Sequence, residues 1–308
     1  MARLLLAFIL ILLPLYSLPQ IASGDRPDSA DKTVLRKAIG YLQTVPSGRA
    51  LLKRAQQAWN FSAPSSPPLK TDSPELAEKL IEFLRWGETS RTDAVLTRQL
   101  DPKTGQESRR REVIVYLRPG QSLNDTILDL AHELIHATAR PAWDPYDPGL
   151  TPGRYVWAAI EGEGGEIEAV AAECSVSMEL ASVLGSSQQR CWTYLANKAN
   201  GQQRVIEKQK IRRDFYRVGK WHHELTRRLG KETALFPSLS ASTPKLFSST
   251  GNAPYPIALL DEYDDLNQVA CENSRKRLEA FSGRTLAALT QTAEQLTTQF
   301  LSRRCRLF

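Results

Sequence analysis

Histidine and cysteine are both scarce in this chain of 308 residues, with four of each. No two cysteines stand three positions apart, which argues against a zinc site built on cysteine pairs. Beyond an apolar run at residues 4–18, no segment approaches the roughly 18 uninterrupted apolar residues of a membrane-spanning helix. No internal repeat divides the chain. We therefore expect one globular unit that is not stably inserted in a membrane.

The apolar run at residues 4–18 follows Arg3 and precedes the small residues at 22–24. A short basic start, an apolar core and a small-residue exit are typical of a secretory signal peptide. We assign residues 1–23 to such a peptide and predict a secreted protein, extracellular or periplasmic. An uncleaved membrane anchor is the alternative, although the run is short for a membrane span.

The four cysteines suit an exported chain, because an even number in an oxidising compartment favours disulfide bonds. Three pairings are open, and free buried thiols are the alternative. We favour Cys174–Cys191 and Cys271–Cys305, which would join a predicted helix to its loop and the tail to the body.

Two of the four histidines, His132 and His136, lie four positions apart with Glu133 between them. On a helix this spacing puts both imidazoles on one face, where they can bind one metal ion. Glu133 can then act as a general base on a water molecule beside that ion. The surrounding segment is mostly apolar, and unpaired polar groups inside such a helix are costly unless a metal holds them.

A β-hairpin is predicted at residues 92–118, directly before this helix, with a turn at 101–105. Ser122 or Asn124 is the predicted N-cap, and Pro141 ends the helix. An edge strand beside an active-site helix can receive an extended substrate through main-chain hydrogen bonds. An ordinary hairpin is the alternative.

A third protein ligand is expected, because catalytic zinc usually has three of them and an open position. The acidic stretch 161–173 begins in a glycine-rich turn and continues into a helix, and Glu166 is our first choice. The alternatives are Glu163 and Glu168 in the same stretch and Asp147 in a proline-punctuated loop.

These features resemble the HExxH zinc metallopeptidases, or zincins. A longer metzincin motif is excluded, because Ala139 and Ala142 occupy the positions of its glycine and third histidine. Glu166 resembles the third ligand of the Glu-zincins. Their motif continues with an acid or amide where this chain has Val170, so the outer partner of a ligand histidine is unassigned, with Asp129 and Glu173 as candidates.

Residues 41–52 also resemble the Ser/Thr-Gly-x-x-Leu-Leu helix of bacterial effector- and toxin-type zinc peptidases. The resemblance spans about residues 41–184. It implies a zincin-like fold, a Zn²⁺ cofactor held by His132, His136 and Glu166, and Glu133 as the catalytic base. His223 is a candidate for stabilising the developing oxyanion.

We predict an α+β, mainly helical fold with a small antiparallel sheet beside the active-site helix. Residues 24–70 form N-terminal helices and a linker, or alternatively a removable prosegment, and 71–308 form a zincin-like catalytic domain with a helical C-terminal part. Helices are expected in two stretches within 30–60, then at 74–86, and finally at about 273–302.

The formal net charge is +6, and basic residues cluster at 204–228 with apolar residues between them. This pattern predicts a long amphipathic helix with a solvated face, and no recognition motif points to nucleic acid. The most consistent function is a secreted zinc-dependent metallopeptidase that hydrolyses a protein or peptide substrate through a zinc-activated water. An exported, non-catalytic zinc-containing binding protein is the main alternative, followed by an adhesin. The oligomeric state is left open.

Overall fold

The computed structural model describes residues 29–61, 68–100, 107–139, 144–184, 189–197, 204–248, 252–281 and 288–305. The predicted signal peptide at 1–23 and the predicted hairpin turn at 101–105 lie outside these ranges. The protein is an α+β structure made mainly of helices, as predicted. Among the described residues, no helix is both long and apolar enough to cross a membrane.

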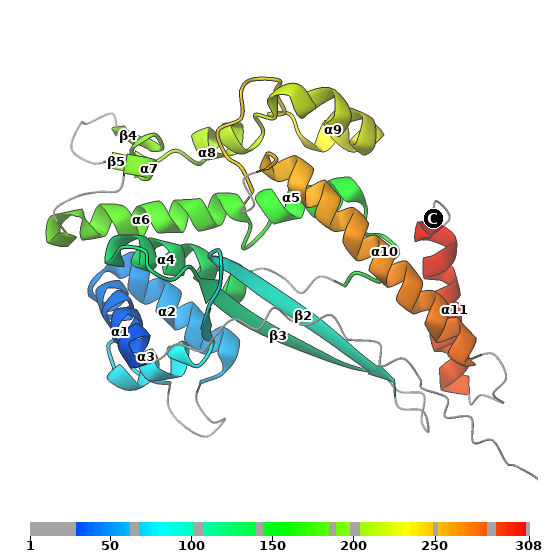
Figure 1. Cartoon of the computed structure of the whole chain (residues 1–308), viewed down its shortest axis with the longest axis horizontal. Coiled ribbons are helices and arrows are strands. Elements are labelled where there is room, and N and C mark those ends of the chain that lie inside the picture. Colours follow the sequence, from blue (N-terminus) through cyan, green and yellow to red (C-terminus); the bar gives the residue numbers. More distant parts are fainter. Residues whose placement is uncertain are drawn as a thin grey trace, which may run out of the picture.

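Helices open the described part of the chain, a small sheet follows them, and the described second half is mostly helical (Figure 1). In chain order the elements are α1 (Ser29–Thr44), α2 (Pro46–Trp59), α3 (Pro74–Ile81), β1 (Leu84–Trp86), β2 (Arg91–Leu100), β3 (Glu107–Leu117), α4 (Leu123–Ala139), α5 (Pro152–Ile160), α6 (Glu166–Leu184), α7 (Gln189–Trp192), β4 (Leu195–Asn197), β5 (Arg204–Ile206), α8 (Lys208–Phe215), the 3-10 turn η1 (Gly219–Trp221), α9 (His222–Leu229), the 3-10 turn η2 (Gly230–Leu235), α10 (Tyr255–Phe281) and α11 (Ala288–Arg304).

The larger sheet has the strand order β1-β3-β2. Strands β2 and β3 form the predicted antiparallel hairpin, and Figure 1 shows it extending away from α1–α4, toward the side of the view on which α11 lies. Strand β1 pairs in parallel with β3, with Leu84 opposite Val115, so the sheet is mixed rather than wholly antiparallel. The predicted helix at 74–86 is therefore too long: α3 ends at Ile81, because Leu84 is drawn into the sheet and fully buried.

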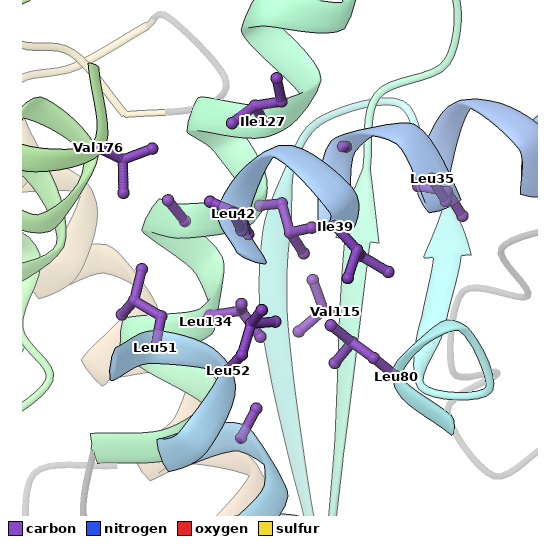
Figure 2. Packing of buried hydrophobic residues seen from close by; sticks show 14 of the residues in the cluster. Leu35, Ile39, Leu42, Leu51, Leu52, Leu80, Val115, Ile127, Leu134 and Val176 are labelled. Atoms are coloured by element: carbon purple, nitrogen blue, oxygen red, sulfur yellow. The ribbon is translucent and has the colours of Figure 1, made fainter. Parts of the chain in front are cut away.

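The first hydrophobic core surrounds α4 (Figure 2). Helices α1 and α2 pack on α4 from one side, with Leu42 and Leu52 fully buried, while β3 adds Val115. Burying a leucine side chain stabilises the fold by about 1.5–3 kcal/mol. The N-terminal helices thus share one core with the helix that carries the histidines, and their removal would expose its apolar side.

Helices α1 and α2 are the two helical stretches expected within 30–60, and the break between them falls at Val45. Helix α2 begins against α6, because Glu179 accepts hydrogen bonds from the Ser47 amide at 2.9 Å and from the Ser47 hydroxyl at 2.7 Å. The carboxylate satisfies a helix-terminal N–H that would otherwise have no partner. This contact explains locally why a serine stands in the first turn of the second helix.

The second core lies on the other side of α6 and joins it to α5, α8, α9 and α10. Side chains of α6 enter both cores: Ala169 and Val176 enter the first, and Ile167 and Cys174 the second. Figure 1 shows α6 running between α4 and the segment that carries α8. Helix α6 therefore fixes the C-terminal part of the chain relative to α4.

The prediction of one long amphipathic helix at 204–228 is wrong, because this segment forms β5, α8, η1 and α9. The backbone leaves the helix after α8 to pair with a distant loop. Val218 N donates to Ser240 O at 2.9 Å, and Gly219 N donates to Ser242 O at 3.0 Å. Gly219 has a φ of +55°, a conformation that favours glycine.

The predicted last helix at 273–302 is two paired helices, α10 and α11, and residues 282–287 between them lie outside the described part. A disulfide bond from Cys271 to Cys305 joins the two helices, and a second bond from Cys174 to Cys191 joins α6 to α7. Both favoured pairings are confirmed.

Candidate metal centre

Helix α4 carries the two histidines and Glu133 on its last three turns. Its N-cap is Ser122 rather than Asn124: the Ser122 hydroxyl accepts from Asp125 N at 3.2 Å, and its carbonyl accepts from Thr126 N at 2.9 Å. The apolar side of α4 lies in the first core, which leaves the histidine face directed toward α6.

His132, His136 and Glu166 form one compact group whose ligand atoms all lie within 4.8 Å of one another. The two Nε2 atoms are 3.2 Å apart. Glu166 Oε2 lies 3.3 Å from His132 Nε2, and Glu166 Oε1 lies 3.4 Å from His136 Nε2. The three side chains come from two different helices and converge on one point.

Glu166 reaches this point because α6 begins directly beside α4. The chain turns through Gly164, at a φ of +66°, and then Gly165. A Cβ on Gly165 would lie 2.9 Å from three main-chain oxygens, including Ala159 O, so only glycine allows this tight turn. The turn places Glu166 at the first position of α6, facing the imidazoles.

The other candidate ligands lie elsewhere. Glu163 is exposed, and Glu168 turns toward Arg54 NH1 at 3.1 Å and the Gly164 amide at 3.0 Å. Asp147 accepts a hydrogen bond from Gly149 N at 2.8 Å within its own loop. Among the described residues, only Glu166 joins the two histidines.

Each ligand histidine uses its Nδ1 atom for an outer partner. His136 Nδ1 lies 2.7 Å from Gly164 O, and His132 Nδ1 lies 3.3 Å from Glu173 Oε2. These contacts favour the tautomer that carries the proton on Nδ1 and leaves the Nε2 lone pair facing the other ring. Both rings are thereby oriented as metal ligands.

Glu173 is the outer partner of His132, the role left unassigned because Val170 stands where the zincin motif has an acid or amide. It stands seven residues after Glu166, on the same side of α6. Its other oxygen pairs with Arg190 Nε at 2.6 Å, and Arg190 NH2 in turn lies 3.2 Å from Asp129 Oδ1. Of the two candidates named from the sequence, Glu173 contacts the histidine directly, and Asp129 holds the arginine behind it.

Glu133 is buried beside the group and is held by β2. The Thr92 hydroxyl lies 2.8 Å from Glu133 Oε2 and 3.0 Å from Glu133 O. Burial raises the pKa of Glu133 above its usual value, and the nearby His132 and His136 partly oppose that rise. A raised pKa brings a carboxylate closer to the value that suits a general base near neutral pH.

The group is also strongly coupled electrostatically. Burial lowers the pKa of His132, but hydrogen bonds to Glu166 and Glu173 outweigh it and raise this pKa well above its usual value. Burial raises the pKa of Glu166, yet the two histidines outweigh it and hold this pKa well below its usual range.

The residues present fit a bound cation. Glu166 Oε2 is buried and, apart from its contact with His132 Nε2 at 3.3 Å, has no hydrogen-bond partner among the described residues. Such an oxygen is costly to bury, and the cost is relieved when the oxygen binds a metal. Two imidazoles and one carboxylate suit a divalent transition metal. A second acidic group, Glu173 with Cys174 and Cys191, is not such a site, because both sulfurs are in a disulfide bond.

His223 stands apart from this centre. It lies in the first turn of α9, is exposed, and no described contact links it to the three ligand residues or to Glu133. Its role as an oxyanion stabiliser stays a prediction. The sequence also gave no indication of Thr92, Gly164 or Arg190, since each reaches the site from a segment outside the motif.

Comparisons of the chain with protein families, with curated proteins and with solved structures find no match.

Proposed function

We propose that the protein is a secreted zinc metallopeptidase of the HExxH type. The observation that carries this proposal is the convergence of His132, His136 and Glu166, with Glu133 beside them. The two disulfide bonds fit an extracellular or periplasmic protein, because such bonds persist in oxidising compartments.

The spacing of the ligand atoms supports zinc. Two nitrogens bound about 2.05 Å from one tetrahedral ion lie roughly 3.3 Å apart, and a nitrogen and a carboxylate oxygen lie about as far apart. The Nε2 atoms here are 3.2 Å apart, and their distances to the Glu166 oxygens are 3.3 and 3.4 Å. The two imidazole nitrogens therefore have the spacing of two ligands on one tetrahedral ion, and Glu166 has one carboxylate oxygen close to each of them.

The number of ligands supports catalysis over a structural role. A structural zinc site is usually closed by four protein ligands, whereas a catalytic site keeps one position open. The group contains three residues, and no fourth His, Cys, Asp or Glu joins it in the part of the chain that the structure describes. This observation favours the enzyme over an exported, non-catalytic zinc-containing protein.

A divalent ion bound here would supply a Lewis acid that polarises a carbonyl group and lowers the pKa of water. The side chains divide the remaining work. Glu133 accepts a proton from the attacking water and delivers it to the leaving amine. Thr92 fixes the carboxylate orientation, and Glu173 and Gly164 fix the two imidazoles.

Strand β2 supplies a surface for an extended substrate. It is an edge strand in the described sheet, and its residue Thr92 touches Glu133. A peptide added along this edge would form main-chain hydrogen bonds and pass beside the catalytic carboxylate. The substrate class that follows is an extended segment of a protein or peptide.

The test compares Glu133→Gln with Glu163→Gln, which makes the same chemical change at an exposed position of the nearby turn. Loss of a general base lowers the rate by about 10²–10⁴-fold, so cleavage of a peptide library should fall by that factor only in the first variant. Both variants should retain zinc. Undiminished cleavage by Glu133→Gln, or activity that survives chelation, would overturn the proposal.

A further inference from the structure

A half-open cavity lies in the C-terminal part of the chain, and its lining shares no residue with the metal group. Its volume is about 700 Å³. It is enclosed by the turn after α7, by α8 and the residues that follow it, and by the segment 237–245. The lining residues are Thr193, Lys210, Arg213, Asp214, Arg217, Pro237, Ser238, Ser240, Ser242 and Lys245.

The cavity is strongly basic. Four of its lining side chains are cationic and one, Asp214, is anionic, which leaves a formal charge of +3. Asp214 is buried and is shared by Lys245 Nζ at 3.3 Å and Arg217 NH1 at 3.7 Å. Asp214 thus orients Arg217 and Lys245, and it leaves Arg213 without a carboxylate partner in the lining.

Donor groups in the cavity lack acceptors. Arg217 Nε is buried and has no hydrogen-bond partner. Arg213 is exposed, and no described carboxylate lies within ion-pair distance of it, while Lys210 pairs with Glu207 at the surface. An anion in the cavity would satisfy the guanidinium groups, which bind tetrahedral oxyanions through several hydrogen bonds at once.

Hydroxyl groups complete the lining, and the backbone holds them in place. Ser240 donates its hydroxyl to Ser242 Oγ at 2.8 Å, and its amide donates to Tyr216 O at 2.9 Å. The contacts of Val218 and Gly219 with the same loop fix it to the end of α8. The cavity is therefore formed before any ligand arrives, which lowers the entropic cost of binding.

We propose that this cavity binds a small, polar ligand that carries at least two phosphate groups. The volume lies within the range of about 300–1,000 Å³ that is usual for small-molecule sites. This site is independent of the proposed peptidase chemistry.

Binding of inorganic pyrophosphate, measured by calorimetry on the full chain at roughly 0.15 M ionic strength, tests the proposal. We expect one saturable site per chain after chelator treatment, since the cavity shares no residue with the metal group. Succinate, a dianion without phosphate, should bind at least tenfold more weakly. Equal binding of succinate, or no saturable binding of pyrophosphate, would refute the phosphate site.

The matched variants are Lys210→Gln with Arg213→Gln inside the cavity, and Arg227→Gln with Lys231→Gln outside it. Both pairs remove two positive charges, so a general charge effect is the same in each. Pyrophosphate affinity should fall at least tenfold in the cavity pair and stay unchanged in the other pair. An equal fall in both pairs would show that the anion is bound by net charge and not by this cavity.

Discussion

The contact between Glu173 and His132 should control how tightly the metal is held. The two side chains meet at 3.3 Å between Oε2 and Nδ1, and Glu173 is 7% exposed, so solvent screens the contact little. Replacing such an outer partner typically weakens metal binding by about 10–100-fold. Because 3.3 Å is long for a hydrogen bond, we expect the lower end of that range for Glu173→Leu, about tenfold or ~1.4 kcal/mol.

Glu173→Gln separates the contribution of the hydrogen-bond acceptor from that of the negative charge. Glutamine keeps an oxygen that accepts from Nδ1 but removes the negative charge, so its zinc affinity should lie between those of Glu173→Leu and the unmodified chain. Arg190 is not left alone in either variant, since it also pairs with Asp129 at 3.2 Å and is partly exposed.

Zinc affinity is measured by competition with a chromophoric chelator, and the free energy of unfolding is measured in parallel with and without zinc. Glu163→Gln serves as the control at an exposed position of the turn before α6 and should bind zinc normally. If Glu173→Leu bound zinc as tightly as the unmodified chain, the reasoning that this carboxylate orients His132 would be refuted.

Two further predictions concern stability. Gly48→Ala should lower the free energy of unfolding by roughly 1–3 kcal/mol, because its Cβ would lie 2.2 Å from Leu42 O, whereas Gly40→Ala has no atom within 4 Å and should stabilise helix α1 by about 0.5–1 kcal/mol. Urea unfolding checks both, and equal effects would contradict the packing argument. The pKa of Tyr194 is raised from 10.0 to about 12, mainly by burial and then by the nearby carboxylates of Asp214 and Glu173. As the pH rises, the Tyr194 hydroxyl therefore loses its proton in the unfolded chain before it does so in the folded chain. The stability due to Tyr194 is lost as the pH rises from the pKa of the unfolded state to that of the folded state. Tyr194→Phe should lose less stability than the unmodified chain over that interval, and an identical alkaline decline would contradict this prediction.

The features predicted best from the sequence depend on short stretches of chain. The spacing of His132 and His136 needs only the geometry of one helix, and the hairpin before it needs two adjacent strands and a turn. Glu166 was our first choice because a carboxylate at the start of a second helix suits a cation. The structure places it, and not Asp147, beside the histidines.

The features predicted wrongly depend on partners that are distant in sequence. Residues 84–86 leave the helical pattern because β3 offers a parallel strand, and the segment at 204–228 breaks where Val218 pairs with Ser240. Helical periodicity alone cannot reveal these competing contacts. The contacts of Thr92 and the Gly164 carbonyl with the site could not be predicted from the sequence for the same reason.

The most direct test of the metal centre is the zinc content of the purified chain by inductively coupled plasma mass spectrometry, compared with that of His136→Ala. We expect one tightly held zinc ion per chain, lost on chelation and restored on dialysis against zinc, and little or none in the variant. A chain that retains no zinc after such loading, or a variant that retains as much as the unmodified chain, would contradict this expectation.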